Sequence, residues 1–239
     1  MCFTIATHLP REAITKKFNV DGGALKDYDY RYFSNAFSNP VIPVISQSDP
    51  GRISLMQWGL IPSWCKDPDQ AYEVRKGTYN ARSESLNGKV AFKHTLQSNR
   101  CIVIASGFFE WQHYTGQKIP WFISLRNGEP MALAGLYDVW TDPSDGVQLT
   151  TFTIITTRAN PMMEKIHNTG KRMPVILSDG SEWIGDNVND EICSRLLIPF
   201  PEDKLDAWTV SSGLLKENSD PRNPDAIKKI SHYTPGTLF

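Results

Sequence analysis

The second residue of the sequence, Cys2, becomes an N-terminal cysteine if Met1 is removed, as is normal for a methionine before a small side chain. Such a residue carries two adjacent nucleophiles, an α-amine with a pKa of about 7.7–8.0 and a thiol with a pKa of about 8.5. The amine condenses with an aldehyde to give an imine, and the thiol then closes a thiazolidine ring. Position alone also fits a structural cysteine buried in a first strand, so other residues must decide.

Two further side chains suit proton transfer. Glu110 lies in the aromatic segment Gly107–Trp111 at the end of a long apolar run, and desolvation there would raise the pKa of its carboxyl group. His167 precedes the basic pair Lys171 and Arg172, and histidine titrates near neutral pH. The alternatives are an exposed ion pair for Glu110 and a polar surface loop for His167. The other four histidines show no ligand spacing, so we expect no metal site.

Groups that suit a phosphate, a sugar or a base occur in two more segments. Asn80 offers a donor and an acceptor, and Arg82 offers the planar fork that fits a phosphate. The alternative for Tyr79–Glu84 is an ordinary turn that leads into a helix. Trp58 and Trp64 flank a loop that could expose both rings for stacking on unpaired bases, and core packing is the alternative for each.

The composition indicates a globular protein without a disulfide framework. The 239 residues include 40% hydrophobic and 21% charged residues, with a formal net charge of -1, so any nucleic-acid surface must be a local basic patch. The start of the chain lacks a signal-peptide core, and no apolar run reaches the ~20 residues of a membrane span. We expect a cytoplasmic protein with free thiols. The cysteines are widely spaced and form no CxxC pair: Cys2, Cys65, Cys101 and Cys193.

Strand patterns dominate over helix patterns. A short amphipathic helix is expected over 10–19, one or two helices with Ser181 as a cap over 181–197, and a turn over 225–230. The result is a single α+β domain over 1–239, with a mostly antiparallel, curved or barrel-like core and a few peripheral helices. The β-rich runs, of which Cys101–Phe109 is expected to form one buried strand, are Val41–Ser46, Ile53–Leu60, Cys101–Phe109, Trp121–Leu125, Met131–Tyr137, Leu149–Thr157 and Val175–Leu177.

Five short segments follow one another in a specific order. They are Met-Cys at position 1, W-G-L-I-P-S-W at 58, N-A-R-S-E at 80, F-F-E-W at 108, and I-H followed by R-M-P-V-I-L from 166. Together they resemble the SOS response-associated peptidase (SRAP) family of abasic-site-processing proteins. The resemblance extends from Cys2 to Leu177, and Trp208–Ser211 is similar to the family's late strand. Each motif is weak alone, and five in order are specific.

The resemblance implies a role for each candidate residue. Cys2 would form a thiazolidine with the ring-opened sugar aldehyde of an abasic site in single-stranded DNA. Asn80 would orient the amine and the sugar, Glu110 would move protons, and His167 would assist sugar-ring opening or reversal of the crosslink. No cofactor is implied, and a monomer is expected. The DNA contacts would be Arg82 and Arg172 on phosphates, Trp58 and Trp64 in a channel, Asn35 and Thr156 as weaker candidates, and Lys171 as a compensating charge.

Two departures from the family pattern affect the site. Phe3 and Thr4 follow Cys2 where the family often has Gly-Arg, so a basic phosphate contact beside the nucleophile is missing. In the family the histidine often stands two residues before Arg-Met-Pro. Here Asn168–Lys171 separate His167 from Arg172, which makes the loop longer.

Three functions remain open at this point. A crosslinker would protect the lesion in the DNA damage response, and β-elimination from an imine that fails to close would add a weak lyase activity. An autocatalytic peptidase would use the same residues, although only Met1 precedes Cys2. A non-enzymatic reader of modified or single-stranded DNA would bind normally after Cys2→Ala and would form no covalent species.

Overall fold

The computed structural model describes residues 2–186, 188–216 and 218–230. Met1, whose removal is expected, and His232 both lie outside these ranges. Within them, no helix is long and apolar enough to cross a membrane.

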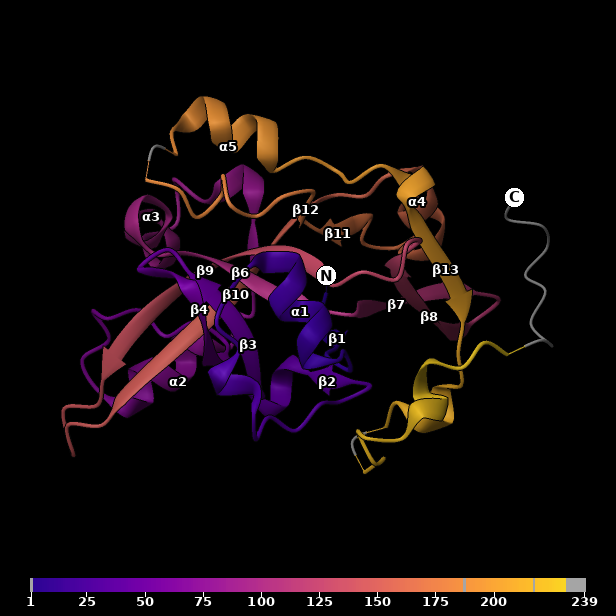
Figure 1. Cartoon of the computed structure of the whole chain (residues 1–239), viewed down its shortest axis with the longest axis horizontal. Helices are drawn as coiled ribbons and strands as arrows, with labels where there is room; N and C mark the ends of the chain where they lie inside the picture. Colours follow the sequence, from indigo (N-terminus) through magenta and orange to yellow (C-terminus); the bar gives the residue numbers. More distant parts are fainter. Residues whose placement is uncertain (1, 187, 217, 231–239) are drawn as a thin grey trace.

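Five strands, each labelled in Figure 1, form the core of the molecule, and their pairings close into a ring. The strands pair antiparallel around the ring except where β10 runs parallel to β4. The expected barrel-like α+β core is thereby confirmed. The ring consists of β3 (Val41–Ser46), β4 (Asp49–Trp58), β6 (Arg100–Ala105), β9 (Met131–Thr141) and β10 (Gln148–Arg158). Short strands extend it: β5 (Asn80–Arg82) and β11 (Arg172–Pro174) pair with β10, and β12 (Ile176–Leu177) pairs with β9.

A second, antiparallel sheet of five strands lies beside the barrel. Its order is β13 (Leu205–Thr209), β8 (Gln117–Leu125), β7 (Gly107–Tyr114), β1 (Thr4–Ala6) and β2 (Ser34–Asn35). The chain's first strand is thus an inner strand of this sheet, next to β7.

The prediction of one buried strand over Cys101–Phe109 is wrong, because the run divides at Ser106 into β6 of the barrel and β7 of the second sheet. Ser106 donates its backbone N–H to the carbonyl of Ala6, 2.8 Å away. At Gly107 a Cβ atom would lie 2.4 Å from the ring of Phe122 and 2.5 Å from the carbonyl oxygen of Ile123, so only glycine allows β7 to begin this close to its neighbour β8 in the second sheet. Hydrophobicity alone cannot reveal this change of sheet, because both halves are buried.

In the part of the chain that the structure describes, five α-helices surround the sheets: α1 (Arg11–Phe18), α2 (Pro68–Arg75), α3 (Val90–Ser98), α4 (Pro161–Ile166) and α5 (Asp190–Leu196). The helix expected over 10–19 is confirmed, and the expected turn over 225–230 overlaps a 3-10 helix at Pro224–Ile227. Ser181 is not a helix cap. The cap of α5 is Asn189, whose side chain accepts from the N–H of Ile192, whereas the N–H of Ser181 is bound by Asp179 in a turn.

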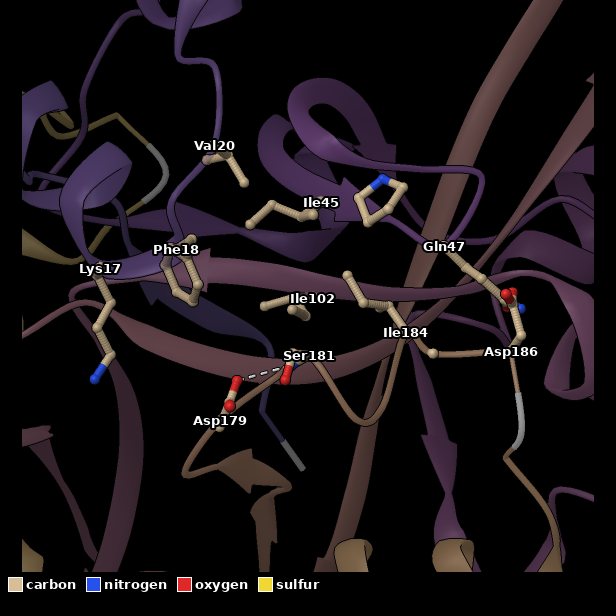
Figure 2. Close-up of a pocket in the computed structure, with 12 residues that line it drawn as sticks. Lys17, Phe18, Val20, Ile45, Gln47, Ile102, Asp179, Ser181, Ile184 and Asp186 are labelled. Atoms are coloured by element: carbon tan, nitrogen blue, oxygen red, sulfur yellow. Dashed lines mark hydrogen bonds between the residues drawn. The ribbon is translucent and has the colours of Figure 1, made fainter.

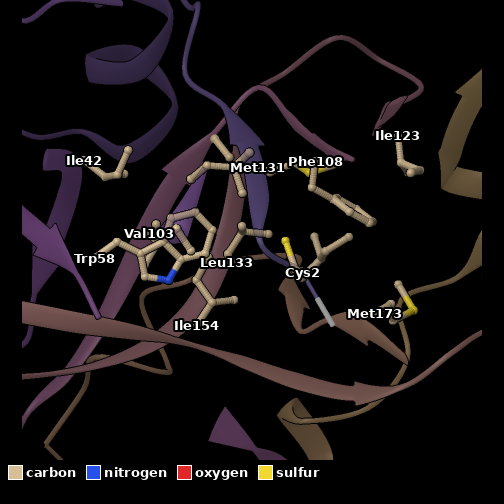
Figure 3. Close-up of a cluster of buried hydrophobic side chains, with 14 of the residues drawn as sticks. Cys2, Ile42, Trp58, Val103, Phe108, Ile123, Met131, Leu133, Ile154 and Met173 are labelled. Atoms are coloured by element: carbon tan, nitrogen blue, oxygen red, sulfur yellow. The ribbon is translucent and has the colours of Figure 1, made fainter. Parts of the chain in front are cut away.

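Buried apolar side chains fill the space inside the barrel and between the barrel and the second sheet. One continuous cluster contains Cys2, Trp58, Leu133 and Met173 (Figure 3). The strand that follows Cys2 therefore holds the start of the chain against the main core, where burial stabilises its position.

Candidate functional site

Cys2 lies next to β7 because the strand that follows it pairs with β7. The register joins Thr4 to Phe109, which brings the preceding residues of the chain alongside Glu110. The Cys2 side chain is fully buried. Burial first, and then the negative charge of Glu110, raise the pKa of the Cys2 thiol far above its ordinary value. The thiol is therefore protonated near neutral pH, and its attack on carbon requires a base.

Glu110 is buried on the same face of β7 as Phe108 and Gln112, as the two-residue period of a strand requires. Burial raises the pKa of Glu110 to about 8, while a hydrogen bond from the backbone of Trp111 favours the ionised form. Near neutral pH the carboxyl group is mostly protonated, yet it ionises readily. It can therefore both donate and accept a proton, as the sequence predicted from its aromatic neighbours.

His167 ends helix α4 and faces Glu110. Its Nδ1 lies 3.7 Å from Oε1 of Glu110 and 2.9 Å from the carbonyl oxygen of Arg172. Because a carbonyl oxygen only accepts, this 2.9 Å contact favours the tautomer with the hydrogen on Nδ1 over the 3.4 Å contact from the N–H of Arg172, which would need a lone pair there. Burial is the main cause that lowers the pKa of His167, which keeps the imidazole neutral at physiological pH.

The longer loop after His167 is anchored to β7. Asn168 accepts from the N–H of His113 and donates to its carbonyl oxygen, at 3.0 and 2.8 Å. Lys171 adopts a left-handed conformation with φ 47° and donates its N–H to the carbonyl of His167. The longer loop thus closes in a tight turn, and His167 still reaches Glu110.

Gly170 packs directly against the imidazole, and a Cβ atom there would lie 2.5 Å from Nε2 of His167. We expect Gly170→Ala to displace the ring and to slow any reaction that uses it by about 10- to 100-fold, because small misplacements of reacting groups cost that much. Reaction rates and the ¹⁵N shifts of the imidazole measure the effect. Gly51→Ala is the control, since a Cβ atom there has nothing within 4 Å. Unchanged shifts and rates in Gly170→Ala would contradict the packing argument.

Gln112 is a positioning residue that sequence reasoning missed. It is buried, donates from Nε2 to the carbonyl of Lys165 at 3.2 Å, and accepts from Nε1 of Trp121 at 3.3 Å. These bonds tie helix α4, and with it His167, to the strand of Glu110. The only signal in the sequence was its spacing of two from Glu110.

Asn80 and the two predicted phosphate ligands line one cavity of about 670 Å³. Strand β10 assembles its wall, because its residues pair with β5 on one side and with β11 on the other. Asn80 is buried, and within the described residues neither polar atom of its side chain has a hydrogen-bond partner. Leaving such a group unpaired costs about 1–3 kcal/mol, so the amide is suited to a ligand that enters the cavity.

The same cavity holds basic residues that the sequence did not single out. Lys89 and Arg158 line it together with Arg82 and Arg172. Arg158 stands opposite Arg172 in the β10–β11 pairing, so its position could have been inferred only once that pairing was known. Four cations around one cavity form the local basic patch that a chain with net charge -1 needs to hold phosphates.

Arg172 is already held in place by protein groups. Its terminal nitrogens bind both carboxylate oxygens of Glu84, at 2.7 and 3.0 Å, and the carbonyl of Thr156 at 2.6 Å. A phosphate must therefore share this guanidinium with Glu84 or replace it. Thr156 is fully buried, and its hydroxyl contacts Arg172 and the carbonyl of Ala81. Its evident contribution is to orient Arg172.

The remaining predicted DNA contacts differ in exposure. Core packing is the correct alternative for Trp58, which is fully buried and donates from Nε1 to the carbonyl of Tyr79 at 2.9 Å. Trp64 is 41% exposed, so its ring could stack on a base. Asn35 and Lys171 are exposed, and the side chain of Asn35 caps a 3-10 helix by accepting from the N–H of Phe37.

A separate pocket of about 500 Å³ lies between the end of α1 and the segment after β12 (Figure 2). Its floor is apolar, with Phe18, Ile45 and Ile102, and Lys17 and Asp179 stand at its rim. It contains none of the predicted catalytic or DNA-binding residues. The chemistry-bearing groups instead gather around Glu110 and in the cavity of Asn80. In the described part of the chain, no three His, Cys, Asp or Glu side chains are grouped so as to hold a metal ion.

Comparison with known proteins gives a consistent result. The family model of the SOS response associated peptidase (SRAP) matches residues 1–216. Abasic site processing protein YoqW of Bacillus subtilis is 36% identical over 216 residues, covering 89% of this chain and 93% of that protein. Abasic site processing protein HMCES of Pongo abelii is 30% identical, covering 96% of this chain and 76% of that protein.

Solved structures agree. The crystal structure of a protein from Bacteroides thetaiotaomicron superposes with a TM-score of 0.89 at 31% identity, covering 96% of this chain and all of that one. A protein from Bordetella bronchiseptica shares the fold, with a TM-score of 0.75 at 24% identity, and covers 88% of this chain. With the ordered motifs, the geometry around Glu110 and the match over residues 1–216, the chain belongs to the SOS response associated peptidase (SRAP) family.

Proposed function

We propose that this protein processes abasic sites in single-stranded DNA by forming a covalent bond between Cys2 and the sugar aldehyde. The observation that carries the proposal is the position of Cys2 beside Glu110, whose carboxyl group in turn faces His167. Relatives at 30–36% identity that bear the name abasic site processing protein support the same substrate. The proposal requires removal of Met1, which would give Cys2 a free amine beside its thiol.

The proposed reaction needs one group that donates a proton and later accepts one. The free amine of Cys2 adds to the aldehyde carbon to give a carbinolamine. Glu110 gives its proton to the carbinolamine hydroxyl, the C–O bond breaks, and water leaves an iminium. The thiol sulfur then bonds to the iminium carbon while its proton returns to Glu110, which leaves a neutral thiazolidine and a protonated carboxyl group. The net loss is one water, and no oxidant or reductant is required.

The neutral His167 and the cavity of Asn80 complete the proposal. An abasic sugar is mostly a closed ring, and Nε2 of His167 carries the lone pair that can take its hydroxyl proton as the ring opens. The unpartnered Asn80 amide would bind the sugar. The cations of the cavity would hold the flanking phosphates, so affinity should fall with salt.

The test is a denaturing gel of the protein mixed with single-stranded DNA that carries one abasic site. A heat-stable shifted band is expected with the native chain and with Cys193→Ala, which removes another free and partly buried thiol. No band is expected with Cys2→Ala, or with a chain whose Cys2 amine is blocked by an N-terminal extension. Absence of the band from protein confirmed by mass to begin at Cys2 would overturn the proposal.

The two alternative functions predict different outcomes, neither of which includes a covalent band. A reader of damaged or single-stranded DNA would bind the strand without a covalent band, and Cys2→Ala would bind equally well. A peptidase, as the family's description suggests, would shorten a peptide without any dependence on the abasic site. The raised pKa of Glu110 would serve peptide chemistry as well, so only the substrate distinguishes these reactions.

A further inference from the structure

Three aromatic rings form a cluster where the chain leaves Cys2. Phe3 and Phe37 stack with their ring centroids 4.9 Å apart and their planes at 26°. Tyr79 meets Phe37 edge to face, with centroids 5.3 Å apart and an angle of 81°. The cluster thus connects the residue after the nucleophile with the residue before Asn80.

The cluster is held by backbone and side-chain hydrogen bonds, so its geometry is rigid. Phe37 lies in a 3-10 helix over Ala36–Ser38 whose first turn is capped by Asn35. The N–H of Ala36 donates to the carbonyl of Phe3 at 2.8 Å. The hydroxyl of Tyr79 donates to the side chain of Asn39 at 3.0 Å. Each ring is therefore fixed from a different direction.

Phe37 is nevertheless 60% exposed, although its neighbours Phe3 and Tyr79 are partly or almost fully buried. Phe3 stacks on its ring and Tyr79 makes a T-shaped contact with it, and the 60% exposure shows that much of the ring surface is still open to solvent. The exposed part of such a ring keeps apolar surface in contact with water, which is unfavourable in free energy, and gains no packing contacts in return. A stacking partner would remove that cost.

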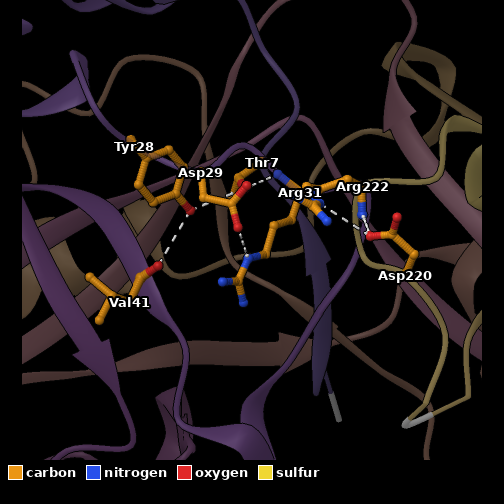
Figure 4. A network of polar contacts seen from close by, with 7 residues as sticks. All are labelled: Thr7, Tyr28, Asp29, Arg31, Val41, Asp220 and Arg222. Carbon is orange, nitrogen blue, oxygen red and sulfur yellow. Dashed lines mark hydrogen bonds and ion pairs between the residues drawn. The ribbon is translucent and has the colours of Figure 1, made fainter.

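Positive charge lies close to the exposed ring. Phe37 lines a pocket of about 410 Å³ together with Arg31 and Lys216. Among the described residues, Arg31 makes one side-chain hydrogen bond, from Nε to Asp29 at 3.1 Å (Figure 4). Its terminal nitrogens are thus available for a phosphate next to the ring, and a base with its phosphate is the occupant that combines both needs.

We propose that Phe37 is a stacking platform for the unpaired base next to the abasic nucleotide. This inference rests on the proposed function, because it assumes that the sugar of the lesion reacts at Cys2. The base would lie on the open face of Phe37, with Phe3 supporting the opposite face. Phe3 thereby compensates for the arginine that this chain lacks at position 4: the strand beside the nucleophile is held by stacking in place of a salt bridge.

Stacking on a phenyl ring tolerates every base, because each base has a π-face. The platform should therefore strengthen binding without a strong sequence preference. Loss of one stacked base lowers affinity by roughly 5- to 100-fold. This contribution should also depend less on salt than the contribution of the basic cavity.

The test uses Cys2→Ser protein, so that binding stays non-covalent, and a DNA strand with a tetrahydrofuran abasic analogue. The fluorescent base 2-aminopurine is placed on the 5′ side of the analogue in one strand and on its 3′ side in another. Binding should quench one of the two strands. Phe37→Ala should abolish that quenching and weaken binding by roughly 5- to 100-fold, whereas Phe37→Trp should retain both.

Tyr72→Ala is the matched control, since Tyr72 is an exposed ring, 63% accessible, on helix α2. Equal affinity and equal quenching in Phe37→Ala and its parent would overturn the inference. The gel with natural abasic DNA is read separately. Phe37-dependent binding without a covalent band would overturn the covalent chemistry and leave the platform standing. A covalent band together with no effect of Phe37→Ala on binding or quenching would overturn the platform and leave the covalent chemistry standing.

Discussion

Glu110→Gln is expected to slow covalent capture of an abasic site by about 10²- to 10⁴-fold, the usual contribution of a general acid–base group. The carboxyl group is the buried proton donor and acceptor beside Cys2, and burial raises its pKa to about 8. Glutamine keeps the shape and the hydrogen-bonding oxygen but neither delivers the proton that removes water nor takes the proton of the thiol. Single-turnover rates on a denaturing gel measure the loss.

The pH dependence of the same rate gives an independent readout. In the proposed reaction Glu110 enters in its protonated form, so the rate should decline as pH rises through about 8. The ascending limb at lower pH reflects loss of a proton from the amine of Cys2, whose ordinary pKa is about 7.7–8.0. Glu110→Gln should lack the descending limb. A native chain that keeps accelerating above pH 9 would contradict the proton-donor role.

Stability should change with pH for the same reason. Burial raises the pKa of Glu110 above the 4.5 of an ordinary carboxyl group, so the folded state holds the proton more tightly than the unfolded chain. That stabilisation is complete below pH 4.5 and is lost as pH rises through about 8. The Tm of the native chain should therefore fall between about pH 5 and 9 by more than that of Glu110→Gln. Glu164→Gln, on the exposed side of α4, is the control and should follow the native chain.

Much of the fold could be predicted from local patterns, since the strands that form the barrel are β-rich runs. The predictions failed where tertiary contacts decide. The run Cys101–Phe109 is almost uniformly apolar, and it divides between two sheets because the residues up to Ala105 pair with β9 whereas those after Ser106 pair with β1 and β8. Ser181 has the chemistry of a helix cap, but Asp179 binds its N–H in a turn and the helix begins later. The local sequence does not show which strand or which hydrogen-bond acceptor, distant or near, each of these segments will meet in the fold.

The candidate site shows the same division. Cys2, Glu110 and His167 could be proposed from residue type and ordered motifs, and the structure groups them. Gln112 and Arg158 could not be proposed, because their relevance arises from strand pairing and from the docking of α4. The burial of Trp58 was equally unreadable, since a tryptophan beside a glycine-proline loop suits a core and a surface alike.

Arg100→Ala is expected to destabilise the fold by about 3–5 kcal/mol, because it removes a large buried side chain and leaves several buried acceptors without a donor. The guanidinium is fully buried and donates only to backbone carbonyls. Nε binds Trp183 at 2.7 Å, Nη1 binds Leu96 and Gln97 at 2.9 and 2.6 Å, and Nη2 binds Gly185 at 2.5 Å. Its loss leaves these acceptors unpaired and opens a cavity beside the Trp183 ring.

Thermal unfolding should show this as a Tm lower by roughly 6–20 °C for a chain of this size. Arg195→Ala is the matched control: its guanidinium pairs with Glu182 on the surface, where solvent screens the ion pair and its contribution to stability is small. Arg100→Lys should recover little, because an ammonium cannot reach carbonyls on both sides as the planar fork does. A Tm change no larger than that of Arg195→Ala would show that water replaces the guanidinium at little cost.

Arg100 also separates stability from chemistry. It joins helix α3 to the segment Trp183–Gly185, and it contacts neither Cys2 nor the cavity of Asn80. Below its lowered Tm, Arg100→Ala should therefore capture abasic DNA at the native single-turnover rate per folded molecule, whereas Glu110→Gln should remain slow at every temperature. If Arg100→Ala were also slow in its folded state, strain would have to pass from α3 to β7 through β6 and β9, the barrel strands on which α3 packs.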